Sequence, residues 1–286
     1  MNIRIIPRLD IKGPNLVKGI NFEGLRVLGK PEYFARHYYE TGADELMYID
    51  AVASLYGRNS LNQIIERTAR QIFIPLVVGG GLRTLEDIRE TLRAGADKVA
   101  INTAAVRRPD LISEAARAFG SSTIVVSIEA IRKSDGTYEQ YTDYGRERTG
   151  LDAFEWALRA AELGAGELVV TSINMEGTGK GFDLKLTRKI AESVSIPVIA
   201  SGGAGAPNHV ADVITEGKAD AVSIASMFHY NCARLRQPNC DEFRDEGNIE
   251  FLRKGAPGPK IQDASIPDLK EYLTDFGLNC RFKSSD

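Results

Sequence analysis

Eight short apolar runs, each followed by a stretch with helical punctuation, constrain the fold of this chain more than any other feature. Near-continuous apolar content is typical of strands that are buried on both faces of a parallel sheet. Helix starts are indicated by capping residues followed by an acid, as in Thr84 with Asp87 and Ser265 with Asp268. Eight strand–helix units in 286 residues predict an α/β protein, a (β/α)8 TIM barrel that forms a single domain over residues 1–286. The expected strands are residues 4–10, 45–50, 74–79, 98–102, 123–129, 167–173, 196–201 and 221–225.

An internal repeat divides this barrel into two half-barrels of four units each. Gly42 and Gly164, which both end helices, are 122 residues apart, and so are Glu45 and Glu167, which both begin strands. The same offset relates further landmarks, namely Gly95 to Gly217, Ile74-Pro75 to Ile196-Pro197, and Gly80-Gly81 to Gly202-Gly203. The alternative is the generic punctuation of strand–helix units, but one offset shared by several kinds of landmark favours a duplicated half-barrel.

One segment breaks the alternation. Residues 230–264 are polar and rich in turn residues, and they lie between the eighth expected strand and a final amphipathic helix at residues 266–276. We expect an insertion in the last strand-to-helix loop, on the face of the barrel where such proteins carry their active sites. A lid, a partner surface and a decoration are all compatible with its composition.

Composition excludes several classes of protein. The 36 basic and 39 acidic residues give a formal net charge of −3, which argues against a general nucleic-acid binder. No apolar run approaches the roughly 20 residues of a membrane span, and the N-terminus lacks a signal-peptide layout. Three sparse cysteines are typical of reduced thiols, so we expect a cytoplasmic protein. Their spacing matches no zinc signature, and we expect neither a metal nor a cofactor.

Glycine pairs end the third and the seventh expected strands, and each pair precedes a helix start. Glycines let backbone amides approach an anion, and a helix N-terminus adds a favourable field. One Gly-Gly pair is more often a plain turn, but two pairs at repeat-related places predict two phosphate sites and a bis-phosphorylated small-molecule substrate. The expected phosphate-binding residues are Gly80 and Gly81 with Asn102 and Thr103, and Gly202 and Gly203 with Ala225 and Ser226.

Three charged residues are candidates for catalysis. Asp10 and Glu129 end the first and fifth expected strands, which face each other across a closed eight-stranded barrel. Such a pair can divide general acid and general base work if the pocket moves the two pKa values apart. Lys18 lies in a long, glycine-rich first loop, residues 12–30, that is suited to closing over a ligand. The alternatives are a solvated loop acid and a solvated lysine.

Four further charged residues each open a strand, at the end of the barrel away from the glycine pairs. They are Arg4, Glu45, Lys98 and Glu167. If their side chains point inward, two basic and two acidic groups form a ring that closes the barrel floor, where the charges must pair. A structural plug and a gate through the barrel axis are both consistent with this ring.

Several motifs also carry a resemblance to a known family, over about residues 2–229 and 265–282. They are Arg4-Ile5-Ile6-Pro7-Arg8-Leu9-Asp10-Ile11-Lys12, Leu16-Val17-Lys18-Gly19, Asn21-Phe22-Glu23, Asp44-Glu45-Leu46, Val77-Val78-Gly79-Gly80-Gly81, Ala96-Asp97-Lys98-Val99-Ala100-Ile101-Asn102-Thr103-Ala104-Ala105 and Ile199-Ala200-Ser201-Gly202-Gly203-Ala204-Gly205. In these motifs the chain resembles the cyclase subunit of imidazole glycerol phosphate synthase, a lyase of histidine biosynthesis.

The resemblance implies a heterodimer with a glutaminase subunit, which docks on the barrel floor. Ammonia then passes along the axis to a bis-phosphorylated ribulosyl aminoimidazole carboxamide nucleotide at the mouth. The products are imidazole glycerol phosphate and an aminoimidazole carboxamide ribotide. By the same resemblance Asp10 is a catalytic aspartate and the floor ring is an ammonia gate. The implied phosphate contacts are Gly81, Asn102, Thr103, Gly177, Gly202, Gly203, Ala225 and Ser226.

Two features depart from the family pattern and keep other hypotheses in view. Glu129 stands where the family has a second catalytic aspartate, and the family run Thr-Ser-Ile-Asp-x-Asp-Gly-Thr is here Thr171-Ser172-Ile173-Asn174-Met175-Glu176-Gly177-Thr178. A second hypothesis is therefore a paralogue that delivers ammonia to a sugar amidotransferase in surface-polysaccharide biosynthesis. A third is a non-catalytic phosphate-binding scaffold that activates a glutaminase; Asp10, the glycine pairs and the floor ring argue against it.

Overall fold

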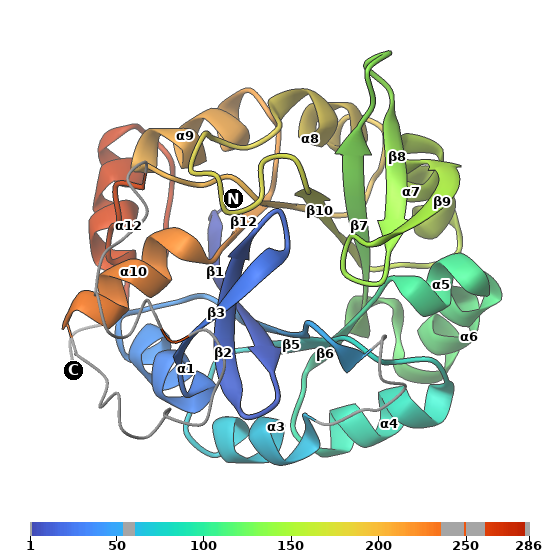
Figure 1. The fold of residues 1–286 in the computed structure, drawn as a ribbon, viewed down its shortest axis with the longest axis horizontal. Helices are drawn as coiled ribbons and strands as arrows, with labels where there is room; N and C mark the ends of the chain where they lie inside the picture. Colours follow the sequence, from blue (N-terminus) through green and yellow to red (C-terminus); the bar gives the residue numbers. More distant parts are fainter. Residues whose placement is uncertain (1, 54–60, 236–248, 250–260, 284–286) are drawn as a thin grey trace.

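Eight parallel strands close into a barrel, and helices surround it (Figure 1). The structure is a computed structural model that describes residues 2–53, 61–235, 249 and 261–283. Each barrel strand pairs in parallel with its two neighbours around the ring, and β10 closes the ring by pairing with β7. The predicted (β/α)8 fold is thus confirmed. The barrel strands are β1 (Arg4–Lys12), β4 (Leu46–Asp50), β5 (Leu76–Gly79), β6 (Lys98–Ile101), β7 (Ile124–Arg132), β10 (Glu167–Ser172), β11 (Val198–Ser201) and β12 (Ala221–Ile224).

The helices form the outer ring, and several begin where the sequence predicts. Thr84 and Ser265 each form a capping box with the acid three residues later. The described helices are α1 (Pro31–Glu40), α3 (Asn62–Ala69), α4 (Leu85–Arg93), α5 (Thr103–Arg107), α6 (Asp110–Phe119), α7 (Ala153–Glu162), α8 (Leu184–Ala191), α9 (Pro207–Thr215), α10 (Ser226–Leu235) and α12 (Ile266–Asp275), with a short 3-10 helix η1 (Ser121–Thr123).

The interior of the barrel is filled by one buried apolar layer to which every barrel strand contributes. Its members are Ile6, Met47, Val77, Ala100, Val125, Val169, Ile199 and Ala221. Two larger apolar clusters lie outside this layer, between the strands and the helices. A packed centre of this kind fixes the strand ends, so the two rims of the barrel are rigid platforms for polar side chains.

The expected first loop, residues 12–30, is instead a β-hairpin, and that prediction was wrong. β2 (Asn15–Ile20) and β3 (Glu23–Gly29) extend the sheet beyond β1, and β2 pairs antiparallel with it. The glycines in this stretch resemble loop punctuation, but Gly13 lies at the turn before β2, with a φ of 61°. β7 is prolonged in the same way by β8 (Tyr138–Thr142) and β9 (Glu147–Asp152), a hairpin that the sequence analysis missed.

The structure describes only part of the insertion expected at residues 230–264. α10 follows β12 at once, so residues 230–235 at the start of that segment are helical, and α12 forms where a final helix was expected. Residues 236–248 and 250–260 lie outside the described residues. The insertion at residues 230–264 and the single domain over residues 1–286 stay predictions.

Candidate active site

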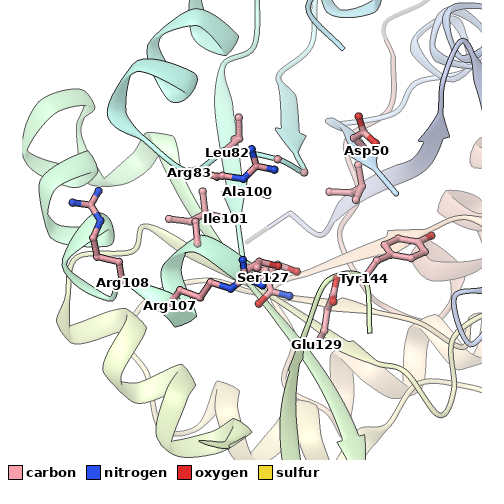
Figure 2. Close-up of a pocket in the computed structure, with 16 residues that line it drawn as sticks. Asp50, Leu82, Arg83, Ala100, Ile101, Arg107, Arg108, Ser127, Glu129 and Tyr144 are labelled. Carbon is pink, nitrogen blue, oxygen red and sulfur yellow. The ribbon is translucent and has the colours of Figure 1, made fainter. Parts of the chain in front are cut away.

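A cavity of about 220 Å³ opens at the carboxyl ends of β5, β6 and β7 (Figure 2). Barrels of this fold carry their ligands at that end of the strands, where backbone loops rather than packed strands meet the solvent. The predicted mouth residues of the first glycine loop come together here with one from the second half-barrel. They are Gly80, Gly81, Asn102 and Thr103, with Glu129 from β7, and Tyr144 joins them.

The first glycine loop forms a cradle of backbone on one side of this cavity. Gly80 and Gly81 have φ values of 99° and 75°, a left-handed region that glycine adopts without strain. A Cβ atom on Gly80 would lie 2.6 Å from the backbone oxygen of Asp50, so a larger residue does not fit. Figure 2 shows Arg83, Arg107 and Arg108 at the same cavity. Their charge makes this cradle suitable for a phosphate, a signal that the glycine pattern alone did not give.

The second glycine loop forms a similar cradle on the β11–β12 side of the mouth. Gly202 and Gly203 also have left-handed φ values, of 87° and 109°. A Cβ atom on Gly203 would lie 1.9 Å from the backbone oxygen of Gly181, so glycine is required there. Together with Gly177, Ala225 and Ser226, where α10 begins, they line a cavity of only about 10 Å³. All the predicted members of this cradle are therefore adjacent, but the space between them is small.

Asp10 lies near the carboxyl end of β1, fully buried, beside a cation that was not among the predicted site residues. The Arg8 Nε donates a hydrogen bond to Asp10 Oδ1 at 2.9 Å. Burial alone would raise the pKa of Asp10, but Arg8, Lys18 and the nearby Tyr144 hydroxyl outweigh it, so the pKa lies below its usual value. Asp10 therefore stays a carboxylate. Arg8 could have been found from its position two residues before Asp10, which places both side chains on one face of the strand.

Glu129 occupies the same mouth but has the opposite electrostatic character. Burial raises the pKa of Glu129 to about 7, and Arg8 and the Gly145 backbone oppose that rise. The Gly145 N–H donates to Glu129 Oε2 at 3.1 Å. The mouth therefore holds one carboxyl group that remains ionised and one that titrates near neutral pH. That separation is the condition under which two carboxyl groups take different roles in acid–base chemistry.

Lys18 reaches into the mouth from β2 and is almost completely buried. It forms an ion pair with Glu176, and its Nζ lies 3.9 Å from Asp10 Oδ2. Burial lowers the pKa of Lys18 to about 8, although Asp10 acts in the other direction. Lys18 is thus not a solvated lysine. Glu176, its partner from the segment after β10, was not among the predicted site residues.

The tips of the two hairpins meet over the mouth. The Phe22 and Tyr144 rings are 4.2 Å apart between centroids and inclined by 35°. Both aromatic residues and the residues just before them have left-handed φ values. These are 52° and 65° for Asn21 and Phe22, and 52° and 59° for Asp143 and Tyr144. Both tips are thus turns of the kind that joins two strands tightly. The Arg8 guanidinium lies 5.2 Å from the Phe22 centroid, so the aromatic pair covers the charged centre of the site.

At the opposite end of the barrel, the four predicted floor residues form a closed ring of ion pairs. Arg4 Nη1 lies 2.8 Å from Glu45 Oε2 and 3.2 Å from Glu167 Oε2. Lys98 Nζ lies 3.0 Å from Glu45 Oε1 and 2.9 Å from Glu167 Oε1. Each cation therefore contacts both acids, and the ring carries no net charge. The geometry expected for these side chains is present, while their role as a gate stays a prediction.

The described residues also bear on metals and membranes. Over residues 2–53, 61–235, 249 and 261–283, no three His, Cys, Asp or Glu side chains are grouped so that they could hold a metal ion. Cys232 is buried and Cys280 is partly buried, and Cys240 lies outside this part of the chain. Among the helices described, none is both long and apolar enough to cross a membrane.

Comparisons with known proteins agree with this geometry. A family model described as "Histidine biosynthesis protein" matches residues 4–234. A protein of Legionella pneumophila is 58% identical over 204 residues, which are 71% of this chain and 96% of that protein. A protein of Alkaliphilus metalliredigens is 49% identical over 237 residues, 82% of this chain and 94% of that protein. Both relatives are named imidazole glycerol phosphate synthase subunit HisF.

Proposed function

This chain belongs to the histidine biosynthesis protein family, and from that premise we propose how its barrel carries out the chemistry of the family. It is a cyclase subunit of the imidazole glycerol phosphate synthase type, a lyase of histidine biosynthesis. The substrate is a bis-phosphorylated ribulosyl aminoimidazole carboxamide nucleotide. With ammonia it gives imidazole glycerol phosphate and an aminoimidazole carboxamide ribotide.

The two glycine cradles hold the two phosphate groups of this substrate. Gly80 and Gly81 offer backbone amides on one side of the mouth, and Gly202 and Gly203 do so on the other. Because Asp10 and Glu129 lie in the mouth between strands of both half-barrels, a substrate anchored at both ends presents its reacting atoms to them. Anchoring of this kind converts part of the binding free energy into a productive geometry. Asn102 and Thr103 complete the first cradle, and Gly177, Ala225 and Ser226 complete the second.

The main support for this proposed reaction is that the pKa of Asp10 is lowered whereas the pKa of Glu129 is raised. An attacking ammonia molecule acquires a positive charge and must lose a proton, which a carboxylate can accept. Asp10, held ionised by Arg8, is the permanent base of the site. Glu129, with a pKa of about 7, can both take up and return a proton near neutral pH. Lys18 adds a positive charge beside Asp10.

The floor ring serves as the gate for ammonia. Arg4, Glu45, Lys98 and Glu167 close the end of the barrel that lies away from the cradles. A plug of apolar side chains would serve structure as well as these charges do. Arg4 and Lys98 keep 24% and 17% of their side chains exposed, whereas Glu45 keeps 2%, so the two cations are the members that can swing outward. Ammonia would then enter the barrel interior from beneath.

A glutaminase subunit is the source of that ammonia, and the barrel floor is its docking surface. The relatives are named as subunits, which supports a two-chain enzyme. Phe73, just before β5 at the floor, is 81% exposed, between cavities of about 250 Å³ and 340 Å³. Phe282, 49% exposed, lines the first of these. An exposed aromatic ring flanked by hollows is a suitable anchor for a partner protein.

The direct test is turnover with ammonium salt and the bis-phosphorylated substrate, followed by detection of both products. A strain that lacks its own cyclase should also regain growth without histidine when it carries this chain. If neither product forms and growth is not restored, while the barrel is folded, the proposed reaction is wrong.

The names of the relatives favour neither the amidotransferase paralogue nor the non-catalytic scaffold. We also propose that the protein is cytoplasmic, because its three sparse cysteines are typical of thiols kept reduced in that compartment.

A further inference from the structure

The two phosphate cradles differ in size although their glycine loops are repeat-related. The cradle at Gly80 and Gly81 opens into a cavity of about 220 Å³. The cradle at Gly202 and Gly203 encloses only about 10 Å³. The smaller volume is about that of one water molecule and is too small for a phosphate. The protein's own atoms therefore leave no room for a phosphate at the second cradle.

Among the residues that the structure describes, the carboxylate of Glu176 is the one acidic group that lines this cavity. Its Oε2 lies 3.4 Å from the place where a Cβ atom of Gly202 would be. The side chain is nearly completely buried. A carboxylate and a phosphate are both oxyanions, and both are stabilised by backbone amides in a glycine loop. Glu176 thus places an anion of the protein at the edge of the cradle that the fold provides for an anion of the ligand.

Glu176 is fixed there by the β2–β3 hairpin. Its carboxylate is paired with Lys18, and the Asn21 backbone N–H donates to the Glu176 backbone oxygen at 2.8 Å. The neighbouring Gly177 is so close to the hairpin that a Cβ atom on it would lie 2.5 Å from the Gly19 oxygen. The hairpin, the Lys18 ammonium and the Glu176 carboxylate therefore form one closed unit over the second cradle.

We propose that Glu176 is an internal substitute for the second substrate phosphate, which displaces its carboxylate and so releases Lys18 for the ligand. Two anions cannot share the cradle, because like charges a few ångströms apart in a poorly hydrated site repel strongly. Once Glu176 has left, Lys18 loses its closest anion and keeps only Asp10, at 3.9 Å, so its charge is available to the incoming phosphate. The first phosphate then binds in the open cradle before the second phosphate opens the other. This inference rests on the proposed use of both cradles for phosphate.

The test uses the full chain and inorganic phosphate, without any turnover. Glu176→Gln removes the charge and keeps the size of the side chain, while Glu176→Asp keeps the charge and withdraws the carboxylate by one methylene. Glu192→Gln is the matched control, because it removes an exposed carboxylate from the end of α8, remote from the mouth. The backbone amide resonances of Gly202 and Gly203 report on the second cradle during a phosphate titration, and those of Gly80 and Gly81 report on the first.

In the unchanged protein we expect phosphate to fill the first cradle at a concentration at least tenfold below that needed for the second. Glu176→Gln should tighten binding at the second cradle at least tenfold and leave the first unchanged. Glu176→Asp should give a smaller gain, and Glu192→Gln none. A residue with a purely structural role would not improve binding when it is replaced. Thermal unfolding of each variant confirms its fold. If Glu176→Gln does not fold, the phosphate affinity of Glu176→Asp is compared with that of the unchanged protein instead.

Three outcomes would overturn the inference. Equal phosphate affinity at the second cradle with and without the Glu176 charge, with the first cradle still binding, would refute the substitution and leave the proposed function intact. Weaker binding at the second cradle in Glu176→Gln would mean that the glutamate builds the site rather than fills it. No phosphate at either cradle in any variant would instead refute the phosphate assignment of the proposed function, and this inference with it.

Discussion

Replacing Glu129 by glutamine should make the barrel more stable at alkaline pH and leave its stability almost unchanged in acid. Burial raises the pKa of Glu129 from 4.5 to about 7 in the folded chain. Between those two values the unfolded chain gives up this proton while the folded chain retains it. The free energy of unfolding of the wild type therefore falls as the pH rises through that window.

The size of the effect follows from the shift. One pKa unit corresponds to about 1.4 kcal/mol, so a shift of about 2.5 units costs about 3 kcal/mol once Glu129 is fully ionised. Glutamine does not ionise, and its side-chain oxygen can still accept the hydrogen bond from the Gly145 N–H. The advantage of Glu129→Gln should thus be small near pH 4.5 and approach about 3 kcal/mol above pH 8.

Urea unfolding of both proteins at a series of pH values from 4.5 to 8.5 measures this difference directly. Glu162→Gln, which removes an exposed carboxylate from α7, controls for the change in net charge. The difference between Glu129→Gln and the wild type must grow with pH, whereas the Glu162→Gln difference must stay nearly constant. A Glu129→Gln difference that is constant or shrinks as the pH rises would refute the assignment of Glu129 as the carboxyl group that titrates near neutral pH.

Three further predictions concern the reaction and the partner. Asp10→Asn should lower ammonium-dependent turnover by about 10²- to 10⁴-fold, because an amide cannot accept the proton; unchanged turnover would remove Asp10 from the chemistry. Lys98→Ala should reduce product formation from glutamine in the assembled enzyme while ammonium salt still supports it, and an equal fall of both rates in a folded barrel would make the ring structural. Phe73→Asp should weaken binding of the glutaminase subunit at least tenfold in calorimetry and leave ammonium-dependent turnover unchanged; unaltered binding would place the partner elsewhere.

The barrel could be predicted from the sequence because its signals are local and repeated. Each strand is a short apolar run, and the offset of 122 residues gives the halves. The hairpins could not be predicted in the same way. The turns from β2 to β3 and from β8 to β9 begin at Asn21-Phe22 and Asp143-Tyr144, and these residue pairs lack the glycine that usually marks such a turn. The turns that precede β2 and β8 contain Gly13 and Gly136, but such glycines are also typical of ordinary loops. The offset itself relates the two tips, so comparison of the repeats was the signal that could have found them.

The candidate site divides along a similar line. Asp10, Glu129 and the floor ring were predictable, because a residue at the end of a barrel strand has a known place. Arg8 was missed although its spacing from Asp10 was a local signal. Glu176 could not be predicted, because its importance comes from a partner far away in the sequence, Lys18 on another element. Charge pairs of this kind depend on the three-dimensional approach of segments that no local pattern records.

The contact between Phe22 and Tyr144 also locates the symmetry axis of the molecule. In a duplicated structure, a residue can touch its own counterpart only where the two-fold axis passes between them. Phe22 and Tyr144 are such counterparts at the mouth, with ring centroids 4.2 Å apart. Glu45 and Glu167 are counterparts at the floor, and both contact Lys98. One line therefore runs from a pair of acids at the floor to a pair of aromatic rings at the mouth, and the duplication that built the barrel is still visible at both of its ends.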